Sequence, residues 1–171
     1  MTPGSVLAFS GEGIVSRFID FITYSAGISH VGIIARHRGR LKLFESTYED
    51  GVQAVKIGQR IERYIGKVWL YPLSRPLYDD EDERLSEFLT GLIGTKYDLA
   101  GALKAAGYFT AKFKASATKP NLSTAFCSEL VAAAHSHCGL FPTCNPSRWS
   151  PNTLIRAERR AGLLLTPERL K

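Results

Sequence analysis

The sequence predicts an α+β fold, because strand-like segments fill the first half of the chain and helical segments fill the second. Its 171 residues suit a single domain, which we expect to span residues 1–171. Hydrophobic residues make up 44% and charged residues 22%, as is typical of globular proteins. No apolar run is long enough to predict a membrane-spanning helix.

Strand predictions rest on short runs rich in β-branched and aromatic residues. Residues 29–35 and 41–46 flank a turn at Arg38-Gly39, so the sequence predicts a hairpin there. Residues 5–9 predict an edge strand, and residues 51–57 and 67–73 predict two more strands. The sheet is therefore expected to be mostly antiparallel.

Helix predictions rest on apolar residues that recur at intervals of three and four. Residues 79–93 begin with an acidic cluster, which is favourable at the positive end of a helix. Residues 126–138 form the strongest apolar helix and end at Gly139. Further helices are predicted for residues 13–24, 98–113 and 150–161, and a loop for residues 116–124.

The chain is basic, with 22 Lys and Arg against 16 Asp and Glu and a net charge of +6. This charge favours anionic partners such as wall polymers or phospholipid headgroups. The basic residues are scattered and no nucleic-acid motif accompanies them, so no nucleic-acid partner is expected. The N-terminus lacks a signal-peptide pattern, which indicates a cytoplasmic location by default. Peripheral membrane contact through residues 100–114 stays open, as does the oligomeric state.

The chain has three cysteines, and an odd number argues against a disulfide framework. Cys127 is expected in the first turn of the helix at 126–138, where the helix dipole and free N–H groups favour a thiolate. These features make Cys127 a candidate nucleophile. The alternative is a small buried hydrophobic residue.

A zinc site is a separate alternative for the remaining thiols. The segment after Cys127 contains ligand-type side chains at His135, His137, Cys138 and Cys144. Their spacing fits no common zinc finger, and His135 and His137 point in different directions on a helix. We therefore expect no metal and no cofactor.

A thiol nucleophile requires a base within hydrogen-bonding reach. His135 and His137 follow Cys127 by eight and ten residues on one helix, about 12–15 Å away. His30 lies in an apolar strand, where an imidazole needs a polar partner, although a backbone partner in the core would also satisfy it. His30 is thus the candidate base.

The hairpin supplies a candidate partner for His30. With a two-residue turn, Thr47 faces His30 across the ladder and Glu45 shares the same face as a diagonal neighbour. A carboxylate would orient the imidazole and stabilise imidazolium. Glu45 is therefore the preferred third residue, with Thr47 as the alternative.

Several motifs then match one family in order. They are Gly4-Ser5-Val6-Leu7, Ser29-His30-Val31-Gly32-Ile33, Phe44-Glu45-Ser46, Gly94-Thr95-Lys96-Tyr97-Asp98 and Phe126-Cys127-Ser128-Glu129-Leu130-Val131. Together they resemble the circularly permuted branch of the NlpC-type papain-like superfamily, the YaeF/YiiX-like amidases. Ser5 departs from the pattern, since the family has an acidic residue there.

The resemblance implies a papain-like core over about residues 4–135, with an antiparallel sheet packed against helices and the nucleophile at a helix N-terminus. It implies a triad of Cys127, His30 and Glu45, and Tyr97 as a substrate-binding residue at the edge of the cleft. The alternative for Tyr97 is a core aromatic residue. Residues 140–171 match nothing and stay unassigned.

The implied activity is that of a cysteine peptidase or amidase that cleaves an amide bond through a thioester. Its substrate would be peptide-like, derived from the cell wall or linked to lipid. Lecithin-retinol-acyltransferase-like enzymes share the permuted order but have a second histidine where Glu45 stands, so acyl transfer or lipid hydrolysis is one alternative. A catalytically silent binding protein is the other.

Overall fold

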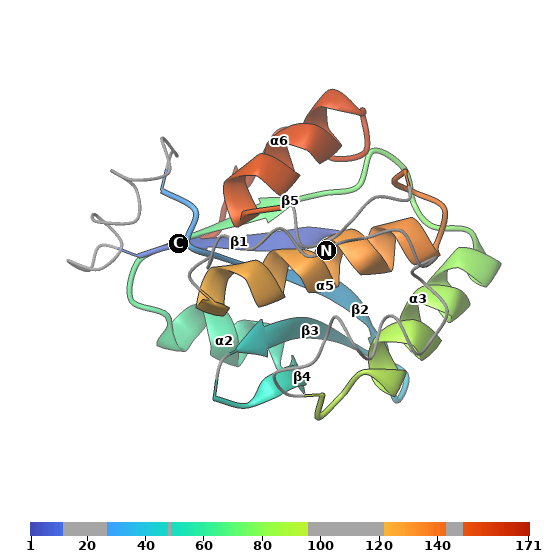
Figure 1. Ribbon diagram of the computed structural model, residues 1–171, viewed down its shortest axis with the longest axis horizontal. Helices are drawn as coiled ribbons and strands as arrows, with labels where there is room; N and C mark the ends of the chain where they lie inside the picture. The colour runs from blue at the N-terminus through green and yellow to red at the C-terminus, as the bar shows by residue number, and fades with distance from the viewer. Residues whose placement is uncertain (12–26, 48, 96–121, 143–148) are drawn as a thin grey trace.

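The computed structural model describes residues 1–11, 27–47, 49–95, 122–142 and 149–171 (Figure 1). Within them the fold is α+β, as the sequence predicts, with one six-stranded antiparallel sheet in the order β4-β3-β2-β1-β5-β6. The strands are β1 (Val6–Ser10), β2 (His30–His37), β3 (Arg40–Thr47), β4 (Gly51–Val55), β5 (Lys67–Tyr71) and β6 (Glu168–Arg169). The helices are α2 (Ile57–Arg63), α3 (Asp79–Gly91), α5 (Leu122–His137) and α6 (Pro151–Arg160).

The β2–β3 hairpin forms at the predicted turn. Arg38 and Gly39 both have positive φ, 52° and 74°, which fits the two-residue turns that match strand twist. His37 pairs with Arg40 and Ile33 pairs with Phe44. His30 and Glu45 lie just beyond the last of these pairs, at the open end of the hairpin.

The expectation that the first strand lies at an edge is wrong. β1 pairs with β2 on one side and β5 on the other. The residues from Val6 to Phe9 are all fully buried, so both faces of this strand are covered. An uninterrupted apolar run is typical of such a strand.

Two groups of buried residues cover the two faces of the sheet. On one face, Val6, Ala8 and Ile33 pack with residues of α3, α5 and α6. On the other, Leu7 and Phe9 pack with apolar residues of α2. We call these the α5 face and the α2 face, and Figure 1 shows α5 lying across the sheet.

Several predicted boundaries differ from the structure. Ile57 begins α2, where the sequence predicted that the fourth strand would continue. α5 begins at Leu122, inside the segment predicted as a loop and four residues before the predicted helix. The predicted helices at 13–24 and 98–113 lie outside the described residues. No helix in the described ranges is both long and apolar enough to cross a membrane.

Residues 140–171, unassigned from the sequence, include elements of the core. α6 packs against α5, and β6 pairs with β5. His135 Nδ1 donates to Glu158 Oε1 at 2.6 Å and His135 Nε2 donates to the Gly4 carbonyl at 2.9 Å. Both side chains are fully buried, so one imidazole joins α5 to α6 and to the segment before β1.

Burial alone would lower the pKa of His135, but the charge and hydrogen bond of Glu158 and the Gly4 carbonyl raise it. Both ring nitrogens are engaged, Nδ1 with the Glu158 carboxyl group and Nε2 with the Gly4 carbonyl. This arrangement leaves no lone pair for a metal, which argues against the zinc alternative at this residue.

We expect His135→Leu to lower the free energy of unfolding by about 3–5 kcal/mol, because it leaves the Glu158 carboxylate buried without its cation. The double variant His135→Leu, Glu158→Leu should recover part of that loss, since an apolar pair replaces the ion pair. Urea unfolding of the single and the double variant, compared with the wild type, measures these changes in the free energy of unfolding. A double variant less stable than the single one would contradict the ion-pair interpretation.

Candidate functional site

His30 and Glu45 lie side by side where β2 begins and β3 ends. His30 Nε2 donates to Glu45 Oε2 at 2.7 Å. The His30 side chain is 16% exposed and that of Glu45 only 2%, so the carboxylate is the more deeply buried of the two. The alternative partner is directed elsewhere, because Thr47 Oγ1 accepts from the backbone N–H of Asp50 at 3.2 Å.

Glu45 has a second cationic partner that the sequence analysis missed. Arg60 Nε donates to Glu45 Oε1 at 2.8 Å and to Oε2 at 3.1 Å. Arg60 lies on α2, a helix that was not predicted, and it is one of 22 basic residues in the chain. No sequence signal distinguished it from the others.

Cys127 reaches the same place from the α5 face. The residue is fully buried, and its side chain forms a hydrogen bond with the His30 ring. Because Nε2 donates to Glu45, Nδ1 is the ring nitrogen left for the thiol. The structure thus brings Cys127, His30 and Glu45 together.

The ionisation of His30 is strongly perturbed. Burial by itself lowers the pKa of His30, but the thiolate charge and hydrogen bond of Cys127, together with those of Glu45, raise the pKa to about 9. The imidazole is therefore protonated at neutral pH, next to two groups that carry negative charge when ionised.

Glu45 is perturbed in the opposite direction. Its burial raises the pKa of the carboxyl group, but hydrogen bonds and charges from His30 and Arg60 outweigh burial and lower it. Glu45 is accordingly a carboxylate at neutral pH, although it is almost completely buried. Such a group can orient an imidazolium and stabilise its charge.

The expectation that Cys127 lies in the first turn of its helix is wrong. α5 begins at Leu122, so Cys127 is its sixth residue and lies in the second turn. The helix dipole acts mainly within the first turn, and the free N–H groups are also found there. The cation beside Cys127 is instead His30.

Other residues singled out from the sequence lie away from this cluster or cannot be placed. Tyr97, the expected substrate-binding residue, and Cys144 lie outside the described residues. His37 lies near Thr90, with Nδ1 and Oγ1 3.3 Å apart. His135 is bound to Glu158, so it is not available to Cys127.

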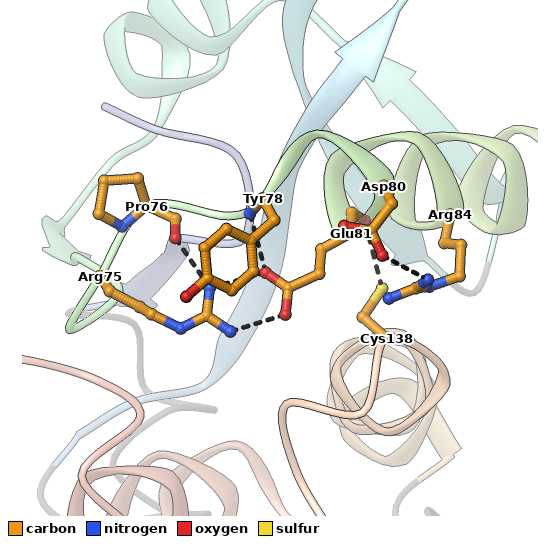
Figure 2. Close-up of polar contacts among 7 residues, drawn as sticks. All are labelled: Arg75, Pro76, Tyr78, Asp80, Glu81, Arg84 and Cys138. Atoms are coloured by element: carbon orange, nitrogen blue, oxygen red, sulfur yellow. Dashed lines mark hydrogen bonds and ion pairs between the residues drawn. The ribbon is translucent and has the colours of Figure 1, made fainter.

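Cys138 lies in a different environment from Cys127. Its Sγ donates to the Glu81 carbonyl at 3.7 Å, close to where α3 begins (Figure 2). Burial is the main cause that raises the pKa of the Cys138 thiol to about 11, and the acidic residues Glu81 and Asp82 add to it. This thiol is therefore neutral at physiological pH.

The first turn of α3 carries the predicted acidic cluster, Asp79 to Asp82. Glu81 accepts from the backbone N–H of Tyr78 at 2.9 Å and from Arg75 at 2.7 and 2.6 Å. Figure 2 shows Arg75 and Glu81 paired at this helix start. The cluster therefore caps a helix.

Comparison with known proteins gives a structural match. No family model matches the chain, and no curated protein matches its sequence. The crystal structure of the metalloprotein YiiX from Escherichia coli O157:H7 superposes with a TM-score of 0.55 at 18% identity. The chain has a YiiX-like fold. The match covers 80% of this chain and 66% of the YiiX chain, just under two thirds of the neighbour's length.

YiiX is described as a metalloprotein. Within the described ranges, no group of three or more His, Cys, Asp or Glu side chains is arranged to hold a metal ion. Both oxygens of Glu45 accept hydrogen bonds from the side chain of Arg60, and Oε2 also accepts one from His30. The described residues therefore do not fit a metal centre.

We expect iodoacetamide to alkylate Cys127 well before Cys138 near neutral pH. The His30 imidazolium lies beside Cys127, whereas burial raises the pKa of the Cys138 thiol to about 11. Peptide mass spectrometry after brief, limiting alkylation measures both sites. His30→Gln should slow labelling of Cys127 and leave Cys138 unchanged, and earlier labelling of Cys138 would contradict the pairing.

Proposed function

We propose that this protein is a papain-like cysteine hydrolase of the permuted NlpC type that cleaves an amide bond. One observation carries the proposal: the imidazole of His30 contacts the Glu45 carboxylate at 2.7 Å and also forms a hydrogen bond with the Cys127 side chain. A nucleophile, a base and a group that orients the base are the three parts such chemistry requires.

In the proposed acylation step, the Cys127 thiolate attacks the amide carbon and a C–S bond forms. The carbonyl oxygen carries the negative charge of the tetrahedral intermediate. His30 then transfers its Nδ1 proton to the leaving nitrogen as the C–N bond breaks. The products are a free amine and a thioester on Cys127.

In the proposed deacylation step, neutral His30 takes a proton from water as the water oxygen attacks the thioester. The C–S bond breaks, the acid is released, and the thiolate and imidazolium are restored. Glu45 stays ionised throughout and stabilises the imidazolium at both stages. Its depressed pKa supports this role.

The proposed substrates are amides of peptide type, including wall-derived γ-linked peptides and lipid-linked amides, with Tyr97 at the edge of their binding site. A carboxylate rather than a second histidine next to His30 favours amide hydrolysis over acyl transfer. Incubation with short peptides and with acyl lipids separates the two, since hydrolysis of a peptide releases an amine.

We expect Cys127→Ala to abolish turnover of such a peptide while the protein stays folded, because the thiol has a chemical role. His30→Ala should cause a comparable loss, and the double variant should be no slower than either single variant, since the residues act as one unit. Cys138→Ala serves as the control and should keep its activity. Additive losses in the double variant would show that Cys127 and His30 are not partners.

We expect kcat/KM to fall as pH rises through about 9, because His30 then loses the proton that the leaving nitrogen requires. Glu45→Gln should lower the rate about tenfold to a thousandfold, since an amide no longer stabilises imidazolium. It should also lower the pKa of His30 and move the alkaline limb to lower pH.

Profiles of kcat/KM against pH for the wild type and for Glu45→Gln measure the shift of the alkaline limb. Glu62→Gln removes the same charge from an exposed position on α2 and should leave the limb in place. An alkaline limb that does not move in Glu45→Gln would exclude Glu45 as the partner of His30.

A further inference from the structure

Arg60 takes no part in the steps above, yet its side chain donates hydrogen bonds to the Glu45 carboxylate. Its Nε spans both carboxylate oxygens, at 2.8 and 3.1 Å. The Arg60 side chain is 24% exposed and the carboxylate 2%, so the guanidinium covers Glu45 from the side of α2.

Two aromatic rings hold the guanidinium in place. The Arg60 Cζ lies 4.7 Å from the centre of the Phe9 ring and 5.4 Å from that of Tyr64. The two rings themselves meet edge to face, with centres 5.0 Å apart. Stacking of this kind restricts a long, flexible side chain to one orientation.

The same aromatic support reaches the proposed base. Phe9 pairs with His30 across β1 and β2, and the two ring centres are 5.6 Å apart. Phe9 is fully buried in the α2 face of the sheet. One buried ring therefore lies against His30 and Arg60, the two cationic side chains that the described residues place beside Glu45.

We propose that Arg60 is a positioning residue of the thiol site: clamped on Phe9 and Tyr64, it fixes the Glu45 carboxylate so that one oxygen points at His30. This inference rests on the proposed function, because it assigns Arg60 a part in the same triad. Arg60 contacts Glu45 rather than the reacting atoms, so it acts through the carboxylate.

The charge of Arg60 and its hold on the Glu45 carboxylate have opposite effects on the pKa of His30, which makes the proposal testable. If Arg60 acted only as a nearby cation, its removal would relieve repulsion and raise the pKa of His30. If it holds Glu45 against the imidazole, its removal lets the carboxylate turn away and lowers that pKa.

The test is an NMR titration of ¹³C-histidine in the full chain, with the His30 signal assigned by its loss in His30→Gln. In Arg60→Met we expect the pKa of His30 to fall by about one unit. Alkylation of Cys127 by iodoacetamide at pH 7 should slow about tenfold, because a weaker base supports less thiolate. Arg60→Lys keeps the charge but not the guanidinium geometry, so its His30 pKa should lie between those of the wild type and Arg60→Met.

Arg63→Met is the matched control, since it removes the same charge from an exposed position on α2 and should change neither reading. An unchanged or raised pKa of His30 in Arg60→Met overturns the proposal, and so does full recovery in Arg60→Lys. If Arg60→Met does not fold, the His30 pKa of Arg60→Lys decides: a value below that of the wild type supports the proposal, and an equal value overturns it. An active Cys127→Ala protein would instead refute the proposed function, so the two failures are distinguishable.

Discussion

The buried carboxylate of Glu45 is the group on which the arrangement of this site depends. At 2% exposure, an ionised carboxylate is stable only when cations and hydrogen-bond donors replace the lost water. His30 and Arg60 supply them from two different elements, β2 and α2. The need to satisfy this one charge therefore fixes a strand and a helix relative to β3.

The proposed site uses side chains from both faces of the sheet. Glu45, Arg60 and Phe9 belong to the α2 face, whereas Cys127 belongs to the core under α5. His30 is the first residue of β2, and this end position lets its ring contact groups from both faces. A histidine deep inside the strand would contact one face only, since side chains alternate strictly along a strand.

The position of Cys127 also depends on residues far from the thiol. The same helix carries His135, which binds Glu158 of α6 and the Gly4 carbonyl. α5 is thus held at its far end by a buried ion pair and at the site by His30. The C-terminal segment contributes to the site indirectly, because it restrains the helix that carries the proposed nucleophile.

The sequence by itself determined the local features: the α+β class, the hairpin at Arg38-Gly39 and the acidic start of α3. It also predicted that His30 and Glu45 would be neighbours, because hairpin register follows from turn length. Only the tertiary structure decided which residues from distant segments meet. Three placements depend on how the elements pack: Arg60 lies beside Glu45, β1 lies inside the sheet, and His135 contacts Glu158. No short-range sequence pattern encodes this packing. The start of α5 at Leu122 was not predicted for another reason, because polar residues such as Ser123 and Thr124 are usual in loops. Helix propensity is a weak preference that tertiary packing can override.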